Sequence, residues 1–274
     1  MLSNTRLKLS APVLCGRIAF VNLLVWRRSL GAPRYAASHL PPLMPSLCYS
    51  ASRPLFVEHP DEPKFHWSKR GSAFLCDFRG SSYAVLARHT VAPYKPEQLR
   101  IPVHDGFTEF FSFDYHWQPQ GADDCHDIFL VRLTTTANDG DWLGSRAPIE
   151  PRASAAAPSS FVPGGGLAVS GYPGIGENEI DYERNTITNQ RFIVEAEYCS
   201  STNEHVHLLR ARQSNVMNDF GGYSGGLVVA RFAEGLVPAG VVITGSAQSS
   251  LMRFIDLQGL YLSLDNFAAQ VDAA

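Results

Sequence analysis

The sequence contains few cysteines. Only five of its 274 residues are Cys, and three of these, Cys76, Cys125 and Cys199, lie outside the basic N-terminal stretch. Three scattered cysteines cannot form a complete disulfide framework, although a Cys76–Cys125 or a Cys125–Cys199 bridge stays open as an alternative. The count argues against a disulfide-stapled secreted module and favours a cytoplasmic location.

Acidic residues are absent from the first 57 positions, which hold seven Lys and Arg residues. Because the whole chain has 23 basic and 26 acidic side chains, the remainder carries 16 basic against 26 acidic ones. An acidic body without a basic stripe argues against a nucleic-acid partner. The apolar segment of the leader, Ile18–Trp26, is too short to cross a bilayer, so we expect no stable membrane span.

Residues 1–57 are therefore interpreted as a basic leader. Their Arg- and Ser-bearing, acid-free composition is that of a transit peptide, so export or organelle targeting is an alternative to a cytoplasmic location. A secretory signal fits less well, because Arg17 interrupts the apolar run and no small-x-small cleavage site follows promptly. We expect this leader to be a disordered extension, or the product of a start codon placed too far upstream.

Long amphipathic periods are almost absent, which argues against a helical protein. Short runs of Val, Ile, Phe and Tyr between Gly, Pro, Asn and Asp instead predict an all-β chain, with strands such as Ile187–Val194 and His205–Leu209. The exception is Leu264–Val271 near the C-terminus, where Asp265 could cap one short helix. A linker rich in Ala, Pro and Ser, Pro148–Pro163, divides the body into two parts.

The segment around Ser224 offers a candidate nucleophile. This serine stands between the pairs Gly221-Gly222 and Gly225-Gly226, and an apolar, β-branched run follows. Glycines allow positive φ angles and close approach to a ligand, and the run predicts a buried strand. A serine on such a turn exposes its hydroxyl beside backbone N–H groups, as acyl transfer requires. A plain hairpin turn has the same composition, so this segment alone does not establish catalysis.

No histidine follows Ser224 in the chain. The pattern Gly222-x-Ser224-x-Gly226 matches the nucleophile elbow of α/β-hydrolases, but in that class the catalytic histidine follows the serine. The lack of a histidine after Ser224 therefore excludes the α/β-hydrolase order of catalytic residues. Serine hydrolases in which the catalytic histidine precedes the serine in the sequence remain as candidates.

Two residues upstream could serve Ser224. The apolar run Tyr83–Val91 predicts a strand that ends on His89, and a hairpin-like turn joins it to the preceding run Gly71–Phe78. Asp127 opens a further apolar run. A residue at the mouth of a strand is held by a rigid sheet, so a carboxylate there could accept the N–H of an imidazole.

In this order the motifs resemble those of the trypsin-like serine peptidases, also called the chymotrypsin fold. They are Leu86-Ala87-Arg88-His89, Asp127-Ile128-x-Leu130-x-x-Leu133 and Gly222-x-Ser224-Gly225-Gly226. The resemblance spans roughly residues 65–270. It implies an all-β fold of two six-stranded antiparallel β-barrels with a short C-terminal helix, in which residues 58–150 form the first barrel and residues 151–274 the second.

The resemblance also implies a serine endopeptidase. Ser224 would be the nucleophile, His89 the general base, and Asp127 the carboxylate that orients the imidazole. The backbone N–H groups of Gly222 and Ser224 would form the oxyanion hole. The partner would be a protein or peptide substrate, and no metal or organic cofactor is required. The alternative is a catalytically silent binding or regulatory module on the same fold.

The chain departs from trypsin at the residue before the serine. Trypsin has an aspartate there, which pairs with a new N-terminal amine after zymogen cleavage. This chain has Tyr223 instead. Because a phenol cannot form that ion pair, we expect that trimming of the N-terminus does not activate this protein in the same way.

The second departure concerns the substrate pocket. Asn218 stands where trypsin has the aspartate that selects Lys or Arg, so a strong preference for basic substrates is not supported, although Asp219 is its neighbour. By the same resemblance, the other wall of the pocket is formed by Thr244, Gly245 and Ser246.

Two further groups of residues could suggest a metal. The segment Asp123-Asp124-Cys125-His126 is dense in metal ligands, but neighbours on a strand point in alternating directions, so we expect no metal there. His205 and His207 would share one face of a strand. We interpret them as a solvent-facing polar stripe, with a metal pair as the less favoured alternative.

Overall fold

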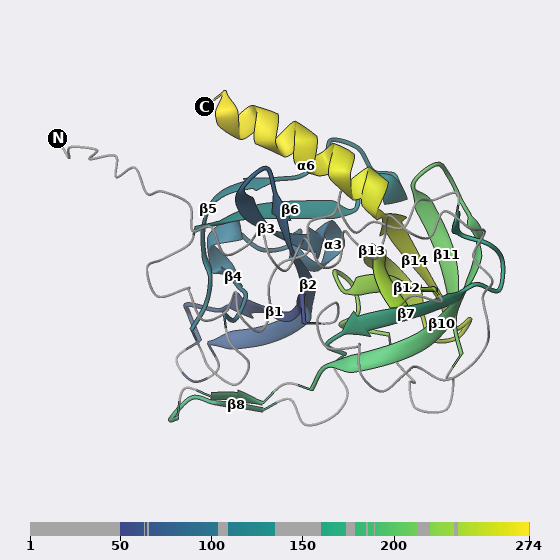
Figure 1. The fold of residues 1–274 in the computed structure, drawn as a ribbon. Helices are drawn as coiled ribbons and strands as arrows, with labels where there is room; N and C mark the ends of the chain where they lie inside the picture. Colours follow the sequence, from purple (N-terminus) through teal and green to yellow (C-terminus); the bar gives the residue numbers. More distant parts are fainter. Residues whose placement is uncertain are drawn as a thin grey trace. The chain divides into compact units, whose positions relative to one another are not determined.

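The computed structural model describes residues 50–62, 64, 66–103, 109–134, 160–173, 179–184, 186–188, 190–212, 220–232 and 235–273. Within these residues the chain is mostly β, with two six-stranded antiparallel sheets and a C-terminal helix (Figure 1). One sheet is a closed barrel and the other a half-barrel. The predicted fold class is therefore confirmed, and the architecture is compatible with a chymotrypsin-like fold.

The first sheet has the strand order β4-β1-β2-β3-β6-β5. Its strands are β1 (Ser52–Glu58), β2 (Trp67–Phe78), β3 (Ser81–Ala87), β4 (Leu99–Arg100), β5 (Ser112–Trp117) and β6 (Ile128–Thr134). The predicted hairpin joins β2 to β3 through Arg79 and Gly80, with φ angles of 49° and 79°. Positive φ at both central residues is the mark of a tight hairpin turn of type I′.

The first sheet begins earlier than we expected. Strand β1 starts at Ser52, within the segment that we assigned to the leader, and not at residue 58. Its residues from Ser52 to Val57 are all buried, and it pairs along its length with β2. The run Leu55-Phe56-Val57 is apolar enough to join a core, which the basic composition of the preceding residues conceals. The expected leader otherwise lies outside the described residues.

The second sheet is a closed barrel with the order β10-β11-β14-β13-β12-β7. Its strands are β7 (Gly166–Gly171), β10 (Phe192–Ser201), β11 (Val206–Ala211), β12 (Leu227–Phe232), β13 (Gly235–Ser246) and β14 (Leu251–Asp256). A separate hairpin consists of β8 (Glu179–Asp181) and β9 (Thr186–Thr188). The predicted strand at 187–194 is thus divided between β9 and β10, and most of the predicted linker lies outside the described residues.

The C-terminal helix α6 (Leu257–Asp272) is longer than predicted. Its N-cap is Asp256, whose Oδ1 accepts a hydrogen bond of 2.7 Å from the N–H of Gly259, so the predicted cap at Asp265 is wrong. Asp265 instead forms an exposed ion pair with Arg79. Among the described residues no helix is both long and apolar enough to cross a membrane.

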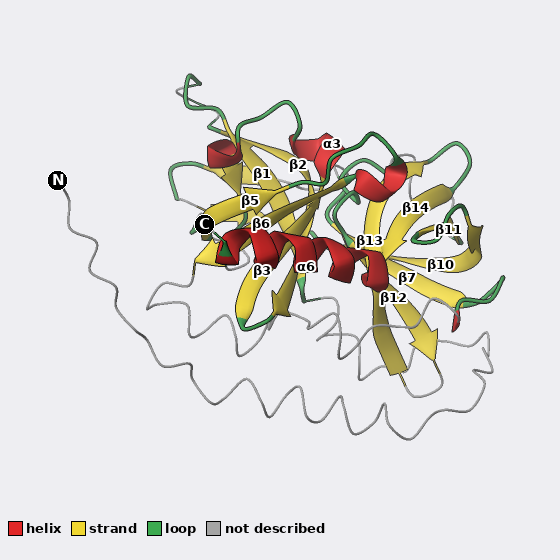
Figure 2. Cartoon of the chain, turned by 90° about the horizontal axis from the view of Figure 1, so that it is seen from above, coloured by secondary structure: helices red, strands yellow, loops and turns green. Residues whose placement is uncertain are grey.

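Helix α6 lies across both sheets (Figure 2). Its Phe267 packs against Tyr83 and Trp117 of the first sheet, with ring centroids 5.6 and 6.4 Å apart. The same apolar cluster includes Val85 of the first sheet and Val229 of the barrel. Because the two sheets share this core, the strand ends that carry the candidate site are held in a fixed relation.

The cysteines of the described residues are not bridged. Cys76, Cys125 and Cys199 are all free, so neither of the two disulfides left open by the sequence is formed. Burial, and to a lesser extent the charge of Asp77, raises the pKa of the Cys76 thiol. Cys76 is therefore a core residue rather than a reactive thiol.

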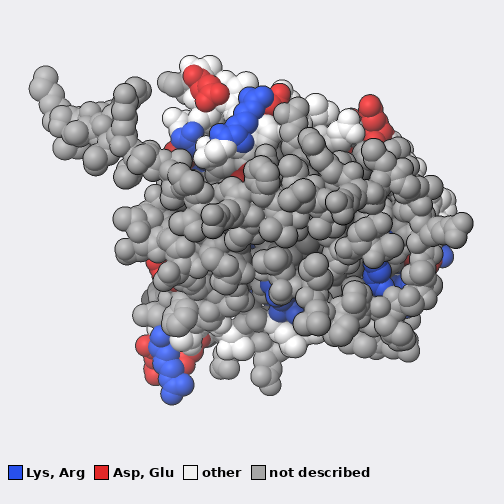
Figure 3. All heavy atoms as spheres, in the orientation of Figure 1, with Lys and Arg blue, Asp and Glu red and all other residues white. Residues whose placement is uncertain are grey.

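Charged side chains of the described residues lie in small groups on the face shown in Figure 3. Several form opposite-charge pairs, such as Arg132 with Asp114 and Arg253 with Asp124.

Candidate active site

His89 and Asp127 lie at the ends of two paired strands. Strand β3 ends at Ala87, and His89 is the second residue of the four-residue helix α3 (Arg88–Val91), not the last residue of the strand as predicted. Asp127 directly precedes β6, after the 3₁₀ turn η2 (Asp124–His126). Because β3 and β6 pair through Ala87 and Ile128, the two residues are brought to the same edge.

Both oxygens of Asp127 hold His89. The ring Nδ1 lies 2.7 Å from Oδ2, and the backbone N–H of His89 donates to Oδ1 at 2.9 Å. With Nδ1–H donating to the carboxylate, Nε2 is left as the acceptor. The side chain of His89 is 48% exposed and that of Asp127 20%. The imidazole is therefore accessible to a substrate, while the carboxylate that orients it is shielded.

Ser224 lies on a tight turn immediately before β12. The N–H of Gly226 donates to the carbonyl of Tyr223 at 2.7 Å, and the N–H of Gly225 donates to Val242 of β13 at 2.7 Å. Gly225 has a φ of +85°, a conformation that L side chains rarely adopt. The glycine after the serine is therefore required by the turn itself.

The serine turn lies against the segment that leads to His89. The carbonyl oxygen of Ser224 accepts a hydrogen bond of 2.9 Å from the N–H of Ser72 on β2. A Cβ placed on Gly71 would lie 2.9 Å from that oxygen and 3.5 Å from the side chain of Thr90, the neighbour of His89. The structure thus brings Ser224 to the start of α3.

Among the hydrogen bonds of the described residues, none joins the Ser224 hydroxyl to His89. Its Oγ donates to the carbonyl oxygen of Ile243 at 3.4 Å, which is longer than an ordinary hydrogen bond between oxygens. Such a bond holds the hydroxyl weakly. Bonds between nucleophile and base are often long or poorly aligned without substrate.

The backbone donors proposed for an oxyanion hole are available. In the described part of the chain, the N–H groups of Gly222 and Ser224 donate to no protein acceptor. The carbonyl of Gly222 accepts a 2.7 Å hydrogen bond from the hydroxyl of Ser72, which itself accepts one of 2.9 Å from the N–H of Tyr172. Ser72 thereby fixes the peptide that joins Gly222 to Tyr223, a role that no sequence pattern indicates.

Tyr223 anchors the turn by apolar packing. Its side chain is 1% exposed, and its ring meets Phe220 edge to face with centroids 6.4 Å apart. Burial raises the pKa of its hydroxyl. A neutral ring in the core of the barrel therefore stands where the resemblance places a charged aspartate.

The predicted pocket residues are only partly described. Asn218 and Asp219 lie outside the described residues. Thr244, Gly245 and Ser246 form the end of β13, directly after Ile243, whose carbonyl meets Ser224. A Cβ on Gly245 would lie 3.2 Å from Phe220, where the serine turn begins. This strand end thus lies beside one side of the serine.

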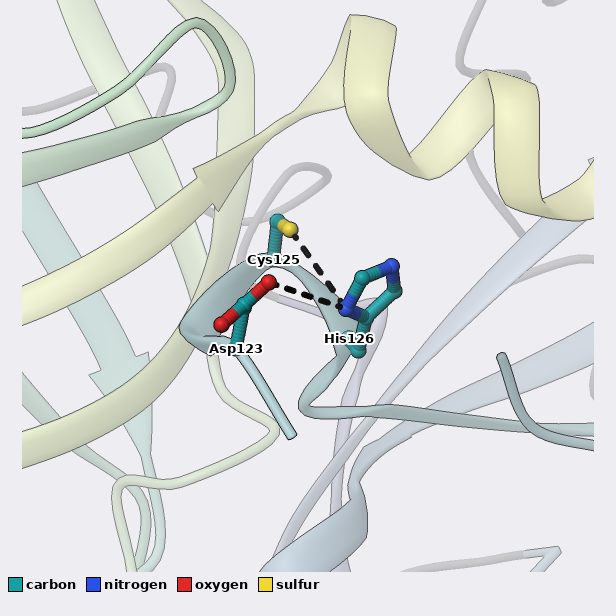
Figure 4. A group of neighbouring side chains, drawn as sticks. All are labelled: Asp123, Cys125 and His126. Atoms are coloured by element: carbon teal, nitrogen blue, oxygen red, sulfur yellow. Dashed lines mark hydrogen bonds and ion pairs between the residues drawn. The ribbon is translucent and has the colours of Figure 1, made fainter. Parts of the chain in front are cut away.

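Asp123, Cys125 and His126 lie close together in the 3₁₀ turn η2 and the residue before it (Figure 4). Nδ1 of His126 lies 3.7 Å from Sγ of Cys125 and 4.0 Å from a carboxylate oxygen of Asp123. The segment is not a strand, so our reason for excluding a metal does not apply. Structural zinc sites have four protein ligands, and the Asp123 side chain is 83% exposed. The absence of a metal here stays a prediction.

His205 and His207 do not form the expected solvent-facing stripe. His207 is 3% exposed, and its ring bonds to Oδ2 of Asp256 at 2.9 Å and to the hydroxyl of Tyr198 at 3.2 Å. His205 lies 3.4 Å from the other oxygen of Asp256. The pair belongs to a buried network at the start of α6, so the predicted stripe is wrong for His207.

The geometry thus joins His89 with Asp127, and places Ser224 next to them on a turn with two available N–H donors. Comparison with models of protein families finds no match for this chain, and comparison with curated proteins finds no match either.

Proposed function

We propose that this protein is a serine endopeptidase of the trypsin-like kind, acting through Ser224, His89 and Asp127. The observation that carries the proposal is the pair of hydrogen bonds that His89 donates to the Asp127 carboxylate, with distances of 2.7 and 2.9 Å, at the edge where the serine turn lies. A carboxylate that fixes an imidazole in this way prepares Nε2 to accept a proton.

The reaction follows from these positions. Ser224 Oγ attacks the carbonyl carbon of the peptide bond, and its proton passes to Nε2 of His89. The N–H groups of Gly222 and Ser224 donate to the oxyanion that forms. The imidazolium then protonates the leaving amine, and the C–N bond breaks to give an ester of Ser224. Water hydrolyses this ester by the same route.

A catalytically silent module is the second candidate, and one observation favours it. The Ser224 hydroxyl bonds to Ile243 rather than to His89. For catalysis, the hydroxyl has to rotate about its Cα–Cβ bond from the Ile243 carbonyl toward the imidazole. A single rotation of an exposed or half-buried side chain is fast compared with catalysis, so the observed position is compatible with an enzyme.

The two candidates differ in the reactivity of Ser224. We expect a fluorophosphonate probe to label the protein, and we expect Ser224→Ala to abolish labelling. His89→Ala should reduce labelling strongly, because the base is lost. Ser112→Ala, which changes an exposed serine at the start of β5, should leave labelling unchanged. Absence of labelling in a folded protein across pH 6 to 9, a range that lies mostly above the ordinary histidine pKa of about 6.5, would favour the silent module.

A further inference from the structure

Two cations precede the part of β2 that contacts the serine turn. Lys69 and Arg70 are followed by Gly71 and Ser72, and the N–H of Ser72 donates to the carbonyl of Ser224. Among the described residues neither cation has an acidic partner. Outside the N-terminal 57 residues the chain carries 26 acidic and only 16 basic side chains, so two cations without acidic partners at one place are unusual here.

Lys69 reaches the oxyanion side of the site. Its Nζ donates to the carbonyl of Pro173 at 2.6 Å, and a Cβ on Gly222 would lie 2.8 Å from Cα of the same proline. The side chain is half-buried, and burial lowers its pKa to about 8. An ammonium group has three donors, so two remain for an anion after the bond to Pro173.

Arg70 lies toward the imidazole side. Its guanidinium stands 5.0 Å over the ring of Tyr94. Tyr94 follows α3, the helix that carries His89, and its N–H donates to Val91 in that helix. The residue itself is exposed, so its fork of donors faces solvent. Lys69 and Arg70 thus lie near the start of β2 and contact two different segments, Pro173 beside the serine turn and Tyr94 after α3.

On the edge away from β1, no described strand pairs with the residues of β2 that precede Phe74. On one edge, β1 pairs with Lys69 and Gly71, but the register shifts at this point and Arg70 has no partner. On the other edge, β3 begins to pair only at Phe74. Ser72 meets Ser224 on this second edge, away from β1. An extended peptide could add to this edge as a strand.

The two sides of the serine receive different parts of a substrate. In the proposed function, the acyl side of the peptide lies along Thr244, Gly245 and Ser246 of β13. The segment that leaves after cleavage then lies on the opposite side of Ser224, where β2 runs. We propose that Lys69 and Arg70 form a binding subsite for acidic side chains at the first two positions after the scissile bond. This inference rests on the proposed function for its direction along the substrate.

The first test reads the cleavage sites themselves. A peptide library prepared from a digested proteome is incubated with the full chain, and the residues that follow each new cut are sequenced. We expect Asp and Glu to be enriched about fivefold at the first two positions, and we expect Lys69→Met and Arg70→Gln each to lower the enrichment at least twofold. Lys95→Met, which removes an exposed lysine that follows Tyr94, should not change it. Equal enrichment in all four proteins would overturn the proposal.

The second test does not depend on catalysis. A C-terminally labelled hexapeptide with Asp and Glu as its first two residues represents the leaving fragment, and its binding to the Ser224→Ala protein is measured by fluorescence anisotropy. We expect the Kd to rise about tenfold when Lys69→Met is added, because a charge-assisted hydrogen bond is lost, and to rise for a peptide that begins with Asn and Gln. Equal affinity for both peptides would overturn the subsite. Failure of fluorophosphonate labelling with retained binding would overturn the peptidase alone.

Discussion

Replacement of Gly225 by alanine tests whether the serine turn depends on close backbone contact. Gly225 combines two constraints, a φ of +85° and a position against β2. A Cβ there would overlap the carbonyl oxygen of Ser72, well inside the 3.0 Å that real Cβ atoms keep from other atoms, and would lie 3.5 Å from the N–H nitrogen of Ala87. Both obstacles are backbone, so neither can move aside by rotating a side chain.

Gly80 offers a matched control. It has a similar φ of +79°, but a Cβ there would meet nothing within 4 Å. The left-handed conformation costs an L-residue about 1–2 kcal/mol, and that cost applies to both substitutions. Overpacking a tight contact adds about 1–3 kcal/mol, which applies only to Gly225. We therefore expect Gly225→Ala to lower the free energy of unfolding by about 2–5 kcal/mol, against about 1–2 kcal/mol for Gly80→Ala.

Urea unfolding followed by intrinsic fluorescence measures both values, since the midpoint shifts in proportion when the slope is unchanged. Fluorophosphonate labelling gives a second readout. It should fall in Gly225→Ala, where the serine turn has to shift, and should persist in Gly80→Ala. If the two variants lose the same free energy of unfolding, Gly225 does not lie against the Ser72 carbonyl, and the placement of Ser224 beside α3 loses its support.

Three further perturbations follow from the structure. Asp127→Asn should slow serine labelling about 10⁴-fold, because an asparagine holds the imidazole in the wrong tautomer, and the urea midpoint should change little. A labelling rate within tenfold of the parent protein would contradict the role of Asp127. Asp256→Ala removes the cap of α6 and the partner of buried His207, and should lower stability by about 2–4 kcal/mol in the same assay, whereas exposed Asp265→Ala should lose less than about 1 kcal/mol. Burial lowers the pKa of Lys69 to about 8 in the folded state, below its ordinary value of 10.5. The unfolded chain therefore binds more protons between pH 8 and 10.5, and the free energy of unfolding relative to Lys69→Met should rise across that range. A constant difference would show that burial does not lower this pKa.

The sequence was sufficient where local patterns determine the structure. The apolar runs around Cys76 and Leu130 became β2 and β6, and the Arg79-Gly80 turn joined β2 to β3. The pairing of His89 with Asp127 was anticipated because both stand where a strand begins or ends. These features depend on alternation and on turn residues that lie within a few positions of one another.

Contacts between distant segments could not be predicted in this way. The roles of Ser72 and Ile243 depend on contacts that β2 and β13, far apart in the sequence, both make with the serine turn. The early start of α6 was missed because Gly259 disfavours a helix and the run from Leu260 suggests a strand. His207 was assigned to the surface because its burial depends on Asp256, 49 residues away.

Helix α6 has a consequence for how the protein is made. Its side chains complete a core shared by Tyr83 and Trp117 in the first sheet and by strands of the barrel, yet it follows every described strand of both sheets in the sequence. During synthesis the first sheet and most of the barrel emerge from the ribosome before the residues that join them. Contacts between such distant segments form late and slowly. The arrangement of His89 beside Ser224 is therefore completed only after α6 has been synthesised, so a chain that stops before Leu257 carries all three site residues without a formed site.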